Sequence, residues 1–114
     1  VTVKGEIGEQ IHESDFGMVM DFKDAKNLIK KVIVDEWDHA FIAYEKDLEV
    51  ISFLNTLDNH KTVILKRVPT AENMALTALE LLSSAFKNEF GDLIRPIKVR
   101  LYETPNNWAD ALTA

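Results

Sequence analysis

The chain has 114 residues, 46% of them hydrophobic, and no run of about 18 apolar residues, so we expect one globular domain that does not span a membrane. Thirteen basic against nineteen acidic residues give a net charge of −6, which argues against a nucleic-acid-binding protein, because phosphate backbones require a basic face. Without cysteine, these residues form no disulfide and no thiolate zinc site.

The first residues, VTVKGEI, alternate between apolar and polar side chains, which predicts a strand over residues 1–7. The pattern is already under way at Val1, without an initiator methionine or a signal-peptide pattern before it. We therefore expect further sequence upstream of Val1. The acidic charge and the lack of a targeting signal make the cytoplasm the expected compartment. A polar loop follows, and then a second short strand over residues 18–20.

A long amphipathic helix is predicted next. Asp21 is a good N-cap residue. Apolar residues then recur at spacings of three and four, which is typical of a helix with one buried face. These residues are Phe22, Ala25, Leu28, Ile29, Val32 and Ile33. The helix should end near residues 37–39.

The middle of the chain leads into a second long helix. Apolar residues between 45 and 59 fit a short helix, and the β-branched segment TVILK, residues 62–66, fits a strand. The segment VPTAEN then predicts a helix start, with Thr70 as the N-cap and Asn73 at the third helical position. Gly91 can end this helix. Its expected buried residues are Ala75, Ala78, Leu79, Leu82 and Phe86.

The last segment, RPIKVRLYETPNNWADALTA, predicts a strand, a turn and a second strand. Ile97, Val99 and Leu101 share one face of the first strand, and Glu103 falls in line with them, in a buried slot. A buried carboxylate needs hydrogen-bond donors or a proton. In one explanation the strand leaves the core before Pro105, so that Glu103 reaches water or pairs with lysine or arginine. In the other, the carboxylate binds the flat N–H edge of a ligand.

The order of strands, two long helices and strands predicts an α+β domain with both helices on one face of an antiparallel sheet. No internal repeat or linker divides residues 1–114, which we treat as a single domain.

Asp38 and His39, after the first helix, are candidates for acid–base chemistry. Histidine transfers protons near neutral pH, and a carboxylate can orient its ring. Alternatively, the histidine complements the dipole at a helix C-terminus. Thr70 and Glu72 have a structural explanation as a cap and a first-turn acid. No two histidines have the spacing of a local metal site, so the chain carries no zinc signature of its own.

Four segments closely resemble the 6-pyruvoyltetrahydropterin synthase family, including its bacterial branch of 6-carboxytetrahydropterin synthases. The segments are GMVMDFKDAKNLIKKVI, WDHAF, PTAENMA and KVRLYETPNNW, and their order and spacing also resemble those of the family. The resemblance runs from Val1 almost to the C-terminus, although residues 43–68 match poorly and look like a longer connection. It implies the tunnelling fold, in which antiparallel sheets from several subunits, each backed by two helices, close into a barrel.

The same resemblance implies that active sites lie between subunits, and it leads us to expect a homohexamer built as a dimer of trimers. The family domain begins with a first strand and part of a second that would precede Val1.

The resemblance also implies roles for individual residues. His39 matches the family's proton-relay histidine, and Asp38 matches its carboxylate partner. Glu103 matches the glutamate that holds the amino-pyrimidine edge of the pterin and belongs to the relay. Thr70 and Glu72 match a segment that lines the pterin pocket. The family's cysteine base and its three histidine zinc ligands fall upstream of Val1, so the implied cofactor is zinc, with ligands outside this chain.

The implied reaction is a zinc-dependent, lyase-type conversion of 7,8-dihydroneopterin triphosphate with loss of triphosphate. Our leading hypothesis is a 6-carboxy-5,6,7,8-tetrahydropterin synthase of queuosine-type biosynthesis. Within the family, the alternatives are the 6-pyruvoyl product from the same substrate and the formation of a hydroxymethyl-dihydropterin. From another class, the alternative is a non-catalytic pterin-binding or structural oligomer of the same fold.

Overall fold

The computed structural model describes residues 1–5, 22–92 and 94–113. The expected strand at 18–20, the Asp21 cap and the last residues of the predicted first strand lie outside the described residues. The described elements confirm the predicted order of a strand, two long helices and two strands. Between the long helices, an additional short strand turns the expected helix and strand into a small βαβ unit.

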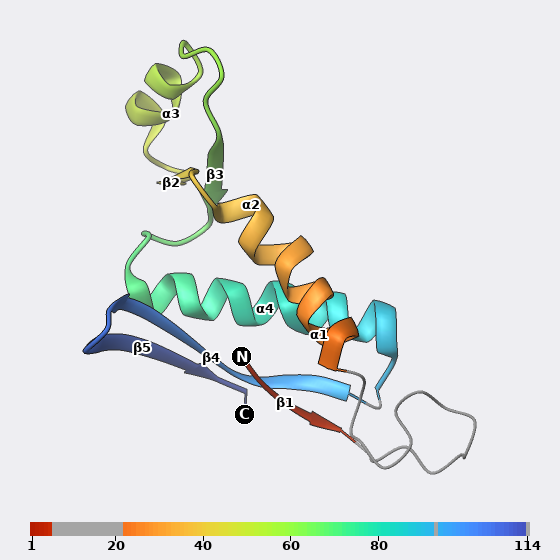
Figure 1. Cartoon of the computed structure of the whole chain (residues 1–114). Coiled ribbons are helices and arrows are strands. Elements are labelled where there is room, and N and C mark those ends of the chain that lie inside the picture. Colours follow the sequence, from red (N-terminus) through yellow and green to blue (C-terminus); the bar gives the residue numbers. More distant parts are fainter. Residues whose placement is uncertain (6–21, 93, 114) are drawn as a thin grey trace.

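A three-stranded antiparallel sheet forms one layer of the fold (Figure 1). Its strands are β1 (Thr2–Gly5), β4 (Ile94–Thr104) and β5 (Asn107–Leu112), with β4 in the centre. β4 and β5 form a hairpin in which Val99 lies opposite Ala111. Pro105 and Asn106 make the predicted turn between them. The outer edges of β1 and β5 have no strand partner within the described residues.

The first long helix contains a change in its hydrogen bonding. It consists of α1 (Phe22–Ile29), the π-helical turn η1 (Lys30–Val34) and α2 (Asp35–Trp37). The Asp35 N–H donates to the carbonyl of Lys30, five residues earlier, and the side chains of the same two residues form an ion pair of 2.8 Å. The predicted end of this helix is confirmed. The π-helical turn is a finding of the structure, because a three-and-four spacing of apolar residues does not distinguish it from an α-helix.

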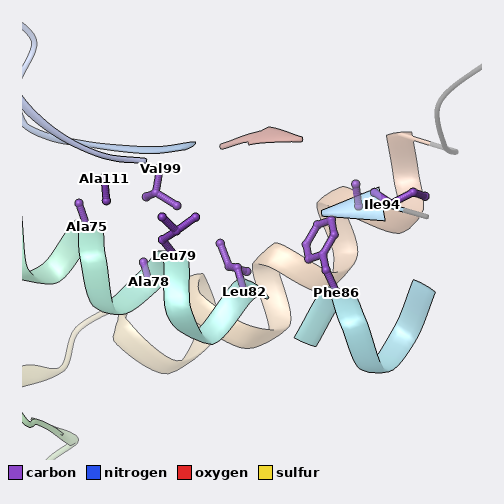
Figure 2. Packing of buried hydrophobic residues seen from close by; sticks show 9 residues of the cluster. Ala75, Ala78, Leu79, Leu82, Phe86, Ile94, Val99 and Ala111 are labelled. Carbon is purple, nitrogen blue, oxygen red and sulfur yellow. The ribbon is translucent and has the colours of Figure 1, made fainter. Parts of the chain in front are cut away.

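The second long helix, α4 (Ala71–Phe90), covers the sheet, and all five of its predicted buried residues are buried. Figure 2 shows Leu79 facing Val99 of β4, with Ala75 below Ala111 of β5. The helix ends at Gly91, whose φ of 69° lies in the left-handed region that glycine adopts without a Cβ clash. The core of the domain therefore lies between α4 and the sheet.

The first helix lies on the same side of the sheet as α4 and packs against α4 (Figure 1). Ala25 joins the buried cluster, and Leu28, Val32 and Trp37 pack against that cluster. Two helices on one face of an antiparallel sheet are thus confirmed. The described chain forms no closed barrel by itself, so closure of sheets into a barrel stays a prediction.

An arm, residues 41–65, connects the two long helices in the sequence and projects away from the core (Figure 1). It contains β2 (Phe41–Tyr44), α3 (Leu48–Leu54) and β3 (Thr62–Leu65). The expected short helix and the strand after it are confirmed. β2 and its parallel pairing with β3 were not predicted, because a four-residue strand beside a helix end has too short a pattern. The arm makes the molecule elongated, with a radius of gyration of 16.7 Å, against about 13 Å for a compact domain of this size.

Candidate functional site

Asp38 and His39 form a turn directly after α2. Asp38 has an extended backbone with ψ of 127°, and His39 has a left-handed backbone with φ of 57°. The Ala40 N–H donates to the Trp37 carbonyl at 3.2 Å, which closes the turn. A left-handed conformation is uncommon for a residue with a Cβ atom, so contacts around the turn have to stabilise it.

The side chains of this pair approach each other outside the helix. His39 Nε2 lies 3.7 Å from Asp38 Oδ2, and the His39 side chain is 93% exposed. Neighbouring residues within an intact helix would point apart, but the helix ends before Asp38. The turn therefore presents an imidazole to the solvent with a carboxylate at ion-pair distance, which is a suitable arrangement for proton transfer.

A lysine that sequence reasoning missed lies against the same turn. Lys61 Nζ donates to the carbonyl oxygens of Asp35 and Asp38, the second at 3.1 Å. Lys61 directly precedes β3, and its place at the helix end depends on the parallel pairing of β2 with β3. No local sequence signal could have found this contact, because the pairing brings together residues that are distant in the chain.

The start of α4 carries two further predicted site residues. Thr70 Oγ1 accepts a hydrogen bond of 3.1 Å from the Asn73 N–H, and Asn73 Nδ2 donates to the Val68 carbonyl at 2.9 Å. The predicted N-cap is confirmed. Glu72 is exposed in the first turn, where a carboxylate complements the helix dipole. A role of Thr70 and Glu72 in substrate binding stays a prediction.

Glu103 is exposed in the single chain, so the expectation of a buried slot is wrong here. The last three residues of β4 are all exposed, and the pairing of β4 with β5 shifts register between Tyr102 and Thr104. The strand has left the core before Pro105, as in the first of the two explanations given for Glu103. Glu103 makes no ion pair with lysine or arginine among the described residues. Its carboxylate is open to a ligand, and its binding role stays a prediction.

A row of charged and aromatic side chains occupies the sheet face opposite α4. Arg100 donates to both carboxylate oxygens of Asp110, at 2.8 and 3.1 Å, and Lys98 Nζ lies 3.5 Å from the same carboxylate. The guanidinium also lies 4.6 Å from the ring centre of Trp108. Hydrogen bonding to Arg100 holds the pKa of the Asp110 carboxyl below its usual value. On this face one carboxylate is therefore shared by two cations close to the end of β4.

The predicted site residues lie in separate places on the single chain. α4 and β4 run in opposite directions, so the start of α4 and the end of β4 lie at the same end of the molecule (Figure 1). Asp38 and His39 lie at the base of the arm. No hydrogen bond or ion pair joins this pair to Thr70, Glu72 or Glu103 within the described residues.

A groove of about 320 Å³ lies between β3 and α4. The bidentate pair of Arg67 and Glu80, with contacts of 2.7 and 3.0 Å, forms part of its lining. None of the predicted site residues borders this groove. The groove therefore does not serve as the predicted pterin pocket.

The part of the chain that the structure describes does not fit a zinc centre. No group of three histidine, aspartate or glutamate side chains in it could hold a metal ion, whereas zinc sites use three or four such ligands. The zinc site implied by the resemblance therefore does not come from these residues. In the same part of the chain, every helix is too short or too polar to cross a membrane.

The family model of 6-pyruvoyl tetrahydropterin synthase matches residues 1–113. The chain belongs to the 6-pyruvoyl tetrahydropterin synthase family. The resemblance of the four segments is thereby confirmed.

Relatives within the 6-pyruvoyl tetrahydropterin synthase family include proteins named 6-carboxy-5,6,7,8-tetrahydropterin synthase. The one from Rickettsia bellii is 35% identical over 98 residues, which are 81% of this chain and 65% of the relative. The one from Haemophilus influenzae is 33% identical over 96 residues, which are 82% of this chain and 63% of the relative. A third, from Rickettsia felis, is 33% identical over 89% of this chain and 72% of its own length. This chain thus spans about two thirds of the length of these relatives.

Proposed function

We propose that the natural protein is a 6-carboxy-5,6,7,8-tetrahydropterin synthase, which converts 7,8-dihydroneopterin triphosphate with loss of triphosphate. The observation that carries this proposal is the name shared by the similar proteins from Rickettsia and Haemophilus. The exposed Asp38–His39 pair supports it, because the reaction requires proton transfers. The 6-pyruvoyl product remains the alternative, because the matching family model is described as 6-pyruvoyl tetrahydropterin synthase.

In this proposal the residues of the chain bind the pterin and move protons. Glu103 accepts two parallel N–H bonds from the amino-pyrimidine edge, a geometry that suits a carboxylate. His39 takes up and releases a proton at its imidazole, and Asp38 orients the ring and stabilises its charged form. Thr70 and Glu72 line the pocket at the start of α4.

We further propose that the site is completed between subunits of a homohexamer. Within the described residues no hydrogen bond or ion pair joins the Asp38–His39 pair to Thr70, Glu72 or Glu103, and each of these side chains is exposed. A second copy of the chain that covers these exposed side chains would enclose a pterin with no change in the fold of either subunit. The edge of β5 supports such an assembly, because it has no strand partner in the described part of the chain and an open sheet edge can pair with another chain.

Zinc enters the proposal only as a property of the natural protein, because the described residues do not fit a zinc centre. We expect the natural protein to bind zinc through histidines upstream of Val1. Metal analysis of the purified natural protein tests this: about one zinc per subunit is expected, as one three-histidine site would hold. A metal-free protein with full activity would contradict it.

The experiment that tests the function is a product assay with the natural full-length protein and 7,8-dihydroneopterin triphosphate. Chromatography and mass measurement of the products separate 6-carboxy-tetrahydropterin from the 6-pyruvoyl compound. The first product, with release of triphosphate, is expected. Formation of the 6-pyruvoyl product would replace the proposal with its alternative. Pterin binding without turnover would favour the non-catalytic protein.

For the relay, His39→Ala should lower kcat by about 100-fold or more, the usual effect of removing a general acid–base, with a much smaller change in KM. His60→Ala is the matched control, because His60 is exposed in the loop before β3 and has no predicted role. Steady-state kinetics of both variants make the comparison. Equal losses in kcat and binding would instead indicate a packing role for His39.

A further inference from the structure

We propose that Lys61 is a positioning residue for the Asp38–His39 pair and that the arm, residues 41–65, serves to place it. This inference rests on the proposed function, because it assigns Lys61 to the relay of that site. The juxtaposition that carries it is the contact of the Lys61 ammonium with the carbonyls of Asp35, in α2, and of Asp38, directly before His39.

The direction of the His39 side chain depends on its backbone. At 93% exposure, the imidazole has almost no packing of its own within the described chain. Its orientation therefore follows from the left-handed φ of 57° at this residue. Such a conformation is unfavourable for a side chain with a Cβ atom and persists only where the surrounding structure maintains it.

Lys61 supplies a contact that maintains this conformation. The last carbonyl groups of a helix have no partner within the helix, and the Lys61 ammonium binds those of Asp35 and Asp38 together. The Asp38 carbonyl belongs to the peptide group that joins Asp38 to His39, so this contact fixes the peptide plane before the imidazole. A cation at a helix C-terminus is also favoured by the dipole.

The backbone of Lys61 holds the chain on the other side of His39. The Lys61 carbonyl accepts a hydrogen bond of 2.8 Å from the Phe41 N–H, and Phe41 lies opposite Thr62 where β2 pairs with β3. A single residue of the arm thus contacts the chain both before and after His39. The turn is anchored at two points to one residue, which limits rotation of the segment that carries the imidazole.

The arm is what brings Lys61 to this place. Between β2 and β3 the chain leaves the core through α3 and returns in parallel, and a parallel pair requires such a crossover. In the sequence analysis, residues 43–68 look like a longer connection than the family has. The inference gives this connection a role: it returns a lysine to the turn of the relay pair.

The test compares Lys61→Met with Lys61→Arg and Lys46→Met in the natural full-length protein. Methionine keeps an unbranched side chain but has no ammonium, whereas arginine keeps a cation with several donors. Lys46 is the matched control, because it is an exposed lysine of the same arm without a hydrogen bond or ion pair among the described residues. For Lys61→Met we expect kcat to fall about three- to tenfold, as for loss of a charged hydrogen bond at a helix end, with KM within about twofold. Lys61→Arg should recover most of the loss, and Lys46→Met should equal the wild type.

A second measurement decides the matter without turnover. Histidine rings labelled with ¹³C give separate NMR signals, and the signal that disappears in His39→Ala is that of His39. In Lys61→Met this signal should shift or broaden, whereas in Lys46→Met it should stay in place. Identical spectra and kinetics for Lys61→Met and Lys46→Met would overturn the inference. Changes in all histidine signals would also overturn it, since they would mean a general loss of structure. If the protein does not act on the pterin triphosphate, the proposed function falls, and the labelled-histidine comparison still supports or overturns the anchoring of the turn.

Discussion

Glu103 is the residue at which the local pattern and the structure differ most clearly. Alternation along β4 places its side chain with the buried apolar residues, yet it is exposed where the strand extends beyond the core. An exposed carboxylate without an ion-pair partner among the described residues keeps its acceptor capacity for a ligand. Burial of this carboxylate costs free energy unless hydrogen-bond donors accompany it, and the N–H edge of a pterin supplies such donors.

The Glu103→Gln variant tests this role. Glutamine keeps the shape of the side chain but turns one acceptor into a donor that faces another donor, so the affinity for a pterin should fall about tenfold or more, as for a lost charged hydrogen bond. Titration with neopterin, which lacks the triphosphate, isolates the contact with the ring. Glu49→Gln, an exposed glutamate of α3, should bind like the wild type. Unchanged affinity in Glu103→Gln would mean that the end of β4 is merely solvated.

Among the elements, α4 depends on its N-cap. Thr70→Ala removes the acceptor of the 3.1 Å bond from the Asn73 N–H and should lower the free energy of unfolding by about 1 kcal/mol, the usual value for such a cap. Urea unfolding at one fixed protein concentration measures the change. Ser84→Ala is the control on the same helix; it should leave the stability equal or slightly higher, because alanine favours helix. Equal stability of Thr70→Ala and the wild type would show that other contacts start the helix.

The β4–β5 hairpin should contribute to the acid sensitivity of the protein. The pKa of Asp110 is lowered in the folded state, chiefly by its hydrogen bonds to Arg100, from a usual value of 3.8. A lowered carboxyl pKa contributes stability that is present above the unfolded pKa and is lost as the pH falls through the folded pKa. Asp110→Asn should therefore reduce the loss of stability as the pH falls below about 4. Urea unfolding at a series of acidic pH values measures the slope, and an unchanged slope in Asp110→Asn would contradict this contribution.

Local signals predicted most of the elements because their causes are local. The Thr70 cap, the buried residues of α4 and the end at Gly91 each depend on a few neighbouring residues. β2 and its parallel pairing with β3 were missed because this pairing depends on the return of the chain after α3. The candidate site divides in the same way. Asp38, His39 and Glu103 stand in recognisable segments, whereas the contact of Lys61 with the turn exists only through that pairing.

At the scale of the whole molecule, the open sheet edge is the feature that points to assembly. Among the described strands β5 lies at an edge with no partner on its outer side, and an unpaired edge favours pairing with another chain. The direction of its N–H groups can be derived from one contact: the Thr113 N–H donates to the Ile97 carbonyl at 3.0 Å. Because N–H groups alternate along an antiparallel strand, those of Asp110 and Leu112 point away from β4, toward the open edge.

Proline at position 112 therefore tests whether this edge joins subunits. Leu112→Pro removes an outward N–H while leaving the bonds to β4 in place, and an edge strand accepts proline at such a position. Leu112→Ala removes the same exposed side chain but keeps the N–H. Light scattering should give the mass of a hexamer for the natural protein and for Leu112→Ala, and a smaller mass for Leu112→Pro at equal concentration. Circular dichroism checks that both variants are folded. Equal masses for the two variants would mean that subunits do not pair through β5, and a monomeric natural protein would contradict the hexamer itself.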